Sequence, residues 1–315
     1  MIAPQTLRGA ETALPKIDDQ ALIRHAKRSD GRFAVIGIAV LLISMTVLLS
    51  MIIDFMVDGL ARIDLAFLTN YPSRRPEQAG ILSAWVGSTL VMVTTALLAV
   101  PLGVAAGVYL EEYAGKNLLS DIIEINVMNL AGVPSIIYGL LALGLFVQTF
   151  RLGQTILVAG MTLALLILPI IIVATREAIR SIPLETREAA YGLGADKWQT
   201  IWMYLLPAAR PGILTGAIVG MSRAIGETAP IITIGALTFI AFLPPAPVSL
   251  EFPFINFQWL NSPFTVMPIQ MFNWISRPQA GFHINAAATG LILLVMTLLM
   301  NGIAIWLRYK IRAKT

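Results

Sequence analysis

The chain has 315 residues, of which 57% are hydrophobic and 13% are charged, with a net charge of +4 and no cysteine. Because soluble domains carry about 25% charged residues, this composition indicates an integral membrane protein. The missing cysteines exclude disulfides, thiolate metal sites and cysteine nucleophiles. The basic residues lie mainly in the connections between apolar segments, which indicates membrane orientation and excludes a nucleic-acid partner.

Apolar runs of about 20 residues or more predict membrane-spanning helices. Six such runs are present, at residues 33–55, 83–110, 127–150, 154–175, 212–242 and 286–307. Only Arg-Leu-Gly separates the third run from the fourth, so these two are predicted to form a tight hairpin. The predicted fold class is an all-α polytopic membrane protein with a permease domain over residues 33–307.

The basic residues also predict the side of the membrane on which each connection lies. Sixteen Lys and Arg residues occur in the N-terminal arm 1–32, the second and fourth connections and the tail 308–315, against five in the other three connections. By the positive-inside rule, both termini and the connection 176–211 are predicted to be cytoplasmic. The arm lacks the apolar core of a signal peptide, so a cytoplasmic, partly disordered arm is expected.

The fifth predicted span contains two charged residues, Arg223 and Glu227. One charge at the centre of a spanning helix costs roughly 2.5–3.5 kcal/mol on insertion scales, so these residues need a compensating role. Helical spacing places a set of helix-packing and helix-breaking residues on or beside their face: Gly212, Gly216, Gly220, Gly226 and Pro230. Because Pro230 cannot donate to the Gly226 carbonyl, the helix is predicted to be interrupted one turn beyond Arg223.

Two interpretations of Arg223 and Glu227 are open. They can form a structural ion pair four residues apart, or Arg223 can attract anions in a permeation path. We favour the path, because arginine before glutamate is the weaker order for a helical pair and because a structural pair needs no neighbouring proline. Interrupted helices are also the usual position of substrate sites in transporters.

The connection 176–211 is predicted to form a helix, a glycine turn and a second helix. Pro183 suits the start of a helix over 184–191, and Gly192 and Gly194 end it. A second helix over 196–206 is expected to end at Pro207. The exposed alanines and tryptophans of this segment suit docking into a groove of another protein, although a solvated connector is the alternative.

Catalytic and nucleotide-binding motifs are absent from the sequence. There is no Walker A segment, no H-E-x-x-H and no G-x-S-x-G, and the only histidines, His25 and His283, are predicted to lie on opposite sides of the membrane. No catalytic residue, metal site or cofactor is therefore expected in the chain, which is not predicted to be an enzyme. Its energy source is a partner protein or an ion gradient.

The segment 188–207 resembles the EAA loop of permeases of importer-type ATP-binding-cassette (ABC) transporters. The matching residues are Glu188, Ala189, Ala190, Gly194, Leu206 and Pro207, whereas Tyr204 replaces the usual isoleucine. Four further segments resemble the permease of the phosphate-specific importer: VPLGVAAGVYLEEYA (100–114), AGVPSIIYGL (131–140), SRAIGETAPII (222–232) and MPIQMFNWISRPQAGFH (267–283). The last of these favours the A-type member of the heterodimeric permease pair.

The resemblance implies a type I importer permease of the bacterial inner membrane that moves inorganic phosphate into the cytoplasm. It implies four partners: a homologous C-type permease, an ATPase dimer that binds ATP and Mg²⁺, an external phosphate-binding protein and the lipid bilayer. Phosphate would cross between the fifth spans past Arg223. Glu227 would either hold Arg223 in position or accept the proton of HPO₄²⁻.

The outer connection 243–285 is expected to combine a gate with a docking surface. One apolar helix face at the outer interface is predicted there, made of Met267, Met271, Phe272, Trp274 and Ile275. A packed lid without partner contact is the alternative. For the whole chain, the alternative functions are a permease for another oxyanion, a gradient-driven anion carrier, and a membrane scaffold or signalling protein.

Overall fold

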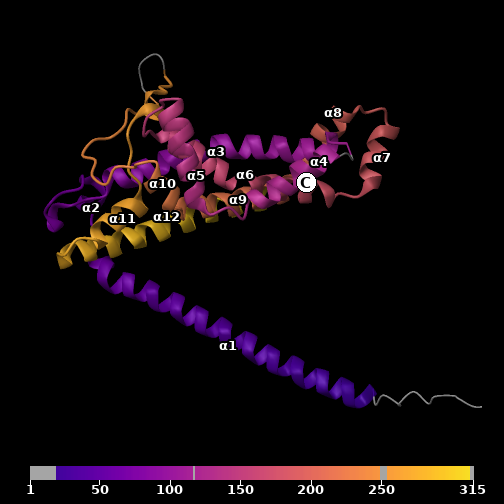
Figure 1. Cartoon of the computed structure of the whole chain (residues 1–315), viewed down its shortest axis with the longest axis horizontal. Helices are drawn as coiled ribbons and strands as arrows, with labels where there is room; N and C mark the ends of the chain where they lie inside the picture. Colours follow the sequence, from indigo (N-terminus) through magenta and orange to yellow (C-terminus); the bar gives the residue numbers. More distant parts are fainter. Residues whose placement is uncertain (1–18, 116–117, 249–253, 313–315) are drawn as a thin grey trace, which may run out of the picture. The chain divides into compact units, whose positions relative to one another are not determined.

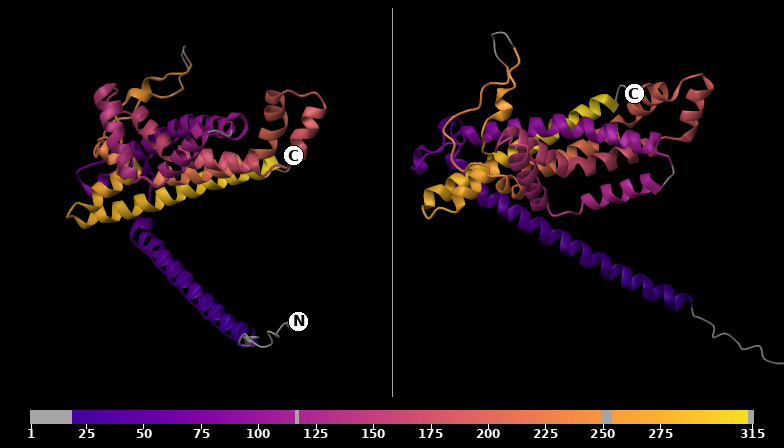
Figure 2. Two further views of the ribbon diagram at one scale, coloured as in Figure 1. Left: turned by 45° about the vertical axis from the view of Figure 1, so that its right-hand side comes forward. Right: turned by 45° about the horizontal axis from the view of Figure 1, so that its top comes forward.

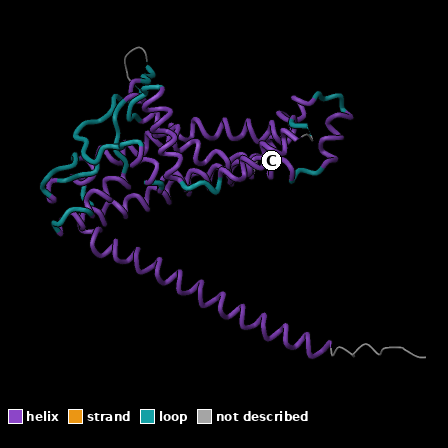
Figure 3. Tube along the Cα trace, viewed as in Figure 1, coloured by secondary structure: helices purple, strands orange, loops and turns teal. Residues whose placement is uncertain are grey.

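The computed structural model describes residues 19–115, 118–248 and 254–312 of the chain. These residues are predominantly helical, and their only β-type pairing is an isolated bridge between Val248 and Ile255 (Figure 3). The chain divides into two compact units, residues 1–54 and 55–315. Residues 1–18 of the predicted arm lie outside the described residues, and helix α1 begins at Asp19.

Twelve α-helices are present in the described residues, and six short 3₁₀ or π turns accompany them. The helices are α1 Asp19–Gly59, α2 Leu65–Thr69, α3 Leu82–Val108, α4 Leu118–Leu130, α5 Ser135–Ala142, α6 Ile156–Arg180, α7 Leu184–Gly192, α8 Lys197–Thr200, α9 Leu206–Gly226, α10 Ala229–Thr233, α11 Met267–Ile275 and α12 Ala280–Arg312. The 3₁₀ turns are η1 Leu60–Arg62, η2 Pro76–Gln78 and η6 Gln258–Asn261, and the π turns are η3 Tyr109–Tyr113, η4 Leu143–Thr149 and η5 Ile201–Leu205.

Four helical stretches in the described part of the chain are long and apolar enough to cross a membrane. They are Asp30–Arg62, Leu82–Tyr113, Ile156–Arg180 and Ala280–Lys310. They coincide with the first, second, fourth and sixth predicted spans. The third and fifth predicted spans differ from the structure, each because of a proline.

The third predicted span is not one straight helix. The segments Ser120–Leu130 and Ser135–Thr149 meet at an angle of 105°, so they form either one broken span or a re-entrant loop. The break lies directly before Pro134, which has no N–H to donate and which disfavours helical geometry in the preceding residue. The Tyr138 hydroxyl group donates to the Leu130 carbonyl at 2.8 Å and holds the two segments together. The prediction of a continuous helix over 127–150 was wrong.

The fifth predicted span is also interrupted. Helix α9 begins at Leu206 and ends at Gly226, Glu227 is extended with φ −83° and ψ 113°, and only the short α10 follows. Beyond Gly226, the part of the predicted span up to residue 242 therefore contains only this short helix. The predicted break one turn beyond Arg223 is confirmed by the end of α9 at Gly226. Its cause is the ring of Pro230, which is incompatible with a helical carbonyl at Gly226.

Helices α3, α6 and α9 pack side by side and form the centre of the second unit (Figures 1 and 2). Glycines allow the close approach of α9 to α6, because a Cβ atom added at Gly216 would overlap the Cβ atom of Ala174. Gly212 approaches Ala178 in the same way. Two glycines of the predicted small-residue stripe, Gly212 and Gly216, thus lie in close contact with α6, and Gly220 makes ordinary van der Waals contacts with the same helix.

Helix α11 packs at the end of the second unit opposite α7 and α8 (Figure 1). Met267 and Trp274 are fully buried, and the Trp274 ring lies 6.0 Å from the ring of Phe67. Phe272 and Ile275, in contrast, are exposed. The prediction that one apolar face contains all five of these outer-connection residues was wrong, because the buried members fill the core beneath α11.

Candidate functional site

The interrupted end of α9 carries the two predicted pathway residues. Arg223 lies in the last turn of α9 and is exposed, whereas Gly216 and Gly220 on the same helix are buried against α6. The charge is therefore outside the α6–α9 contact. None of the ion pairs among the described residues includes Arg223 or Glu227. The interpretation of a structural ion pair between them receives no support from this geometry.

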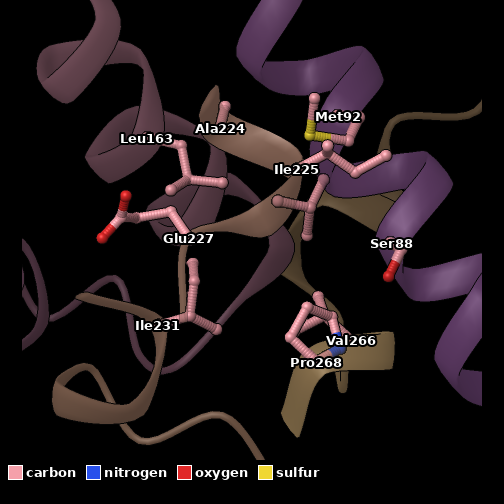
Figure 4. Close-up of a pocket in the computed structure, with 10 residues that line it drawn as sticks. Ser88, Met92, Leu163, Ala224, Ile225, Glu227, Ile231, Val266 and Pro268 are labelled. Atoms are coloured by element: carbon pink, nitrogen blue, oxygen red, sulfur yellow. The ribbon is translucent and has the colours of Figure 1, made fainter. Parts of the chain in front are cut away.

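Glu227 is half-buried at the break between α9 and α10 and lines a small cavity (Figure 4). Apart from Glu227 and Ser88, the side chains around this cavity are apolar: Val91, Met92, Leu163, Ala224, Ile225, Ile231, Val266 and Pro268. The Ser88 hydroxyl group already accepts a hydrogen bond from the Met267 N–H at 2.9 Å. The Glu227 carboxylate points away from the other labelled side chains (Figure 4). The cavity is therefore part of the packing around the break and offers no site for an anion.

Two further contacts fix the break in space. Pro230 is buried against Gly139 of α5, where a Cβ atom would overlap Thr233 and Pro230. On the other side, the Ser222 hydroxyl group donates to Asn301 Oδ1 of α12 at 2.6 Å. Sequence reasoning did not identify Gly139 or Asn301 as site residues. Their role depends on contacts between distant segments, and a local pattern does not contain such contacts.

The predicted helix–turn–helix of the connection 176–211 is confirmed by α7, the turn at Gly194 and α8. Gly194 has φ +85°, a conformation that favours glycine, and α8 begins with a capping box between Asp196 and Gln199. Of the EAA residues, Glu188 and Ala189 are exposed and Ala190 is buried. The tip is strongly apolar, with Leu193 82% exposed, and the exposed rings of Trp198 and Trp202 stack at 5.7 Å. An exposed apolar surface of this kind indicates a protein partner.

Pro207 does not end the second helix, contrary to the prediction. The π turn η5 joins α8 to α9, and the Leu206 N–H donates to the Ile201 carbonyl five residues earlier. A π turn widens the helix, so it accommodates the proline ring and the missing N–H of Pro207. Leu206 and Pro207 are half-buried at this junction. They therefore belong to the junction with α9 and not to the exposed tip.

The fold defines the class of the protein. The structure resembles a chain of the MetNI methionine ABC transporter in an inward-facing conformation, with a TM-score of 0.55 and 16% identity over 73% of this chain and 95% of that chain. This likeness identifies a type I ABC importer permease fold.

The sequence comparisons then give the family. The chain belongs to the family described as binding-protein-dependent transport system inner membrane component, which matches residues 99–313. It is 35% identical over 233 residues to the phosphate transport system permease protein PstA of Mycobacterium leprae, which covers 73% of this chain and 72% of that protein. It is 30% identical over 256 residues to the probable ABC transporter permease protein YqgI of Bacillus subtilis, covering 80% and 85% respectively. The chain is thus a transmembrane transport subunit.

Proposed function

We propose that the chain is one of two permease subunits of an ATP-driven importer of inorganic phosphate, and that it forms half of the translocation path. The observation that carries this proposal is Arg223, an exposed cation without an ion-pair partner in the described residues, at the interrupted end of α9. A guanidinium group suits an oxyanion because its planar donors match two oxygen atoms. The phosphate permease PstA of M. leprae, at 35% identity, supports phosphate as the oxyanion.

The second permease is needed to complete the path. In the isolated chain Arg223 is exposed, and a cation open to lipid would be costly, so this face of α9 is expected to lie against a homologous C-type permease. Phosphate would pass between the two chains. Arg223 would lower the electrostatic barrier without forming a tight site, because transport requires that the ion also leaves.

The energy would come from an ATPase dimer that binds ATP and Mg²⁺ and receives α7 and α8 in a groove of its surface. The exposed Leu193, Trp198 and Trp202 support this docking. The chain itself would hold no cofactor. With both termini and the α7–α8 segment in the cytoplasm of a bacterial cell, an external phosphate-binding protein would deliver the substrate to the opposite face.

The test is reconstitution of this chain with a candidate C-type permease and ATPase in liposomes, with the phosphate-binding protein and labelled phosphate outside and ATP inside. We expect ATP-dependent phosphate uptake and little uptake of sulfate. Uptake that persists with an ion gradient and without ATP would identify a gradient-driven carrier. Equal uptake of sulfate would identify a permease for oxyanions in general, and normal cellular uptake after deletion of this chain would favour a scaffold.

Glu227 provides a separate prediction about selectivity. With no ion pair between Glu227 and Arg223 in the described residues, we propose that the carboxylate accepts a hydrogen bond from the P–O–H group of HPO₄²⁻, which sulfate lacks. Glu227→Gln should lower the preference for phosphate over sulfate by about tenfold, the worth of one hydrogen bond to a charged group. Competition between labelled phosphate and sulfate in the liposomes measures this preference. Glu185→Gln, at an exposed position of α7, is the control, and an unchanged preference in Glu227→Gln would refute proton recognition.

A further inference from the structure

The end of the helix begun by α3 carries two adjacent carboxylates, Glu111 and Glu112, in the π turn η3. Negative charge at the C-terminal end of a helix is unfavourable, because the helix dipole is negative there. The two side chains are nevertheless only 15% and 8% exposed. Carboxylates that are largely removed from water at such a position require cationic partners, and the partners here come from two different helices.

Glu111 pairs with arginines of α6. Arg180 donates from Nε at 3.2 Å and from Nη2 at 3.1 Å, and Arg176 lies 3.5 Å away while also pairing with Glu124 of α4. These contacts join α3, α4 and α6 to one another. They do not reach α7 or α8.

Glu112 pairs instead with Arg187 of α7, the residue directly before the EAA sequence. Arg187 donates from Nη2 at 2.9 Å and from Nε at 3.2 Å to one Glu112 oxygen. The same guanidinium group donates to the carbonyl of Ile179 at 3.2 Å and to that of Ile182 at 3.1 Å. One side chain therefore joins the end of α3, the C-terminal end of α6 and the first half of α7. We call Glu112 and Arg187 the root pair.

The same π turn also holds the second arm of the connection. Lys197 Nζ at the start of α8 lies 4.8 Å above the ring of Tyr113, which stacks on Tyr109 at 6.4 Å. A small apolar core nearby combines residues of α3, α6, η5 and α9: Val108, Ile179, Ile201, Leu205, Ala209 and Ile213. The α7–α8 segment is thus held against the end of α3 by Arg187 and Lys197, whereas Leu193, in the turn between the two helices, is exposed.

We propose that Glu112 and Arg187 are positioning residues that make the α7–α8 segment move as one body with α3 and α6, so that a displacement at the tip reaches the membrane helices. This inference rests on the proposed function as a transporter. Its physical basis is that an ion pair largely removed from water keeps its geometry, because separating the partners leaves a charge without compensation in a poorly solvated place. The contacts of Arg176 and Arg180 serve a different purpose, since they join α6 to α4 and to the end of α3 and do not involve α7.

The test measures phosphate imported per ATP hydrolysed by the complete complex in liposomes. In Glu112→Gln and in Arg187→Gln this ratio should fall about fivefold or more. Fivefold is the lower end of the range found for energetic coupling between two sites of one protein. Because the two residues act as one unit, the double variant should lose little beyond either single variant. Arg187→Lys keeps the charge and should retain about half of the ratio or more. Arg180→Gln is the control, because it removes an arginine that pairs with the neighbouring carboxylate of the same π turn, Glu111, without touching α7.

A ratio that is unchanged in both root-pair variants, or that falls equally in Arg180→Gln, would overturn the proposal. If the unmodified complex transports no phosphate, the proposed function fails first. A purely structural role would lower the amount of assembled complex and would reduce uptake and hydrolysis in the same proportion, which leaves the ratio constant.

A second measurement does not depend on transport. The sequence contains no cysteine, so spin labels can be attached specifically at Tyr191→Cys on α7 and Leu102→Cys on α3, two exposed positions outside the proposed docking residues. In the assembled complex the distance distribution between these labels should be narrow and should broaden in Glu112→Gln. An equally narrow distribution in the variant would contradict the proposal even where the variant transports poorly.

Discussion

Arg223→Gln is expected to lower ATP-dependent phosphate uptake about a hundredfold, the largest effect of any single substitution proposed for this chain. A positive charge about 4 Å from a singly charged anion is worth about 4 kcal/mol at an effective dielectric constant of 20. A glutamine side chain and nearby water recover part of this energy. ATP hydrolysis should persist, because the substitution lies far from the α7–α8 segment.

Arg210→Gln provides the matched control for this result. Arg210 is exposed on the same helix but lies in its first turns, away from the break at Gly226. Its replacement should leave uptake within about twofold of the unmodified protein, as is usual for a surface substitution away from special features. Arg223→Lys should be intermediate, since lysine keeps the charge and loses the planar pair of donors. Uptake by Arg223→Gln at the unmodified rate would refute the role of Arg223 in the path.

Gly194→Val is expected to reduce phosphate uptake about tenfold or more while the ATPase continues to hydrolyse ATP. At φ +85° a β-branched residue costs about 2 kcal/mol, so the turn between α7 and α8 changes shape. No atom lies within 4 Å of the place where a Cβ atom would be added, so the effect arises from the backbone and not from a steric clash. Uptake and hydrolysis measured in the same liposomes test this separation.

Two substitutions distinguish the backbone effect from side-chain volume. Gly194→Asn should be close to neutral, because asparagine tolerates the left-handed conformation. Gly192→Ala adds a methyl group to an equally open position of the same segment that has no positive φ, and it should also be close to neutral. Normal coupling in Gly194→Val would refute the assignment of this turn to ATPase docking.

The sequence predicts best those features that depend on neighbouring residues. The first, second, fourth and sixth spans follow from uninterrupted apolar runs, and the break after α9 follows from Pro230 one turn beyond Gly226. The bend at Pro134 was missed because hydropathy continues unchanged through it. The sequence predicts a helix end at Pro207 because proline usually terminates a helix. The π turn η5, which accommodates this proline, has no recognisable sequence pattern.

The candidate site shows the same division. Arg223 and Glu227 were identified as isolated charges in an apolar run, and the EAA residues as a spaced motif. The root pair was not identified, because Glu112 and Arg187 are 75 positions apart and meet only in the folded chain. The close contact between Pro230 and Gly139 was not predicted either, because these two residues are also far apart in the sequence.

The π turn η5 joins α8 and α9 into one uninterrupted helical run from Lys197 to Gly226. At about 1.5 Å per residue, Lys197 and Arg223 are separated by about 40 Å along it. The segment proposed to dock on the ATPase and the cation proposed to face the phosphate therefore lie at the two ends of one uninterrupted helical run, so that the α7–α8 tip is joined to Arg223 without an intervening loop.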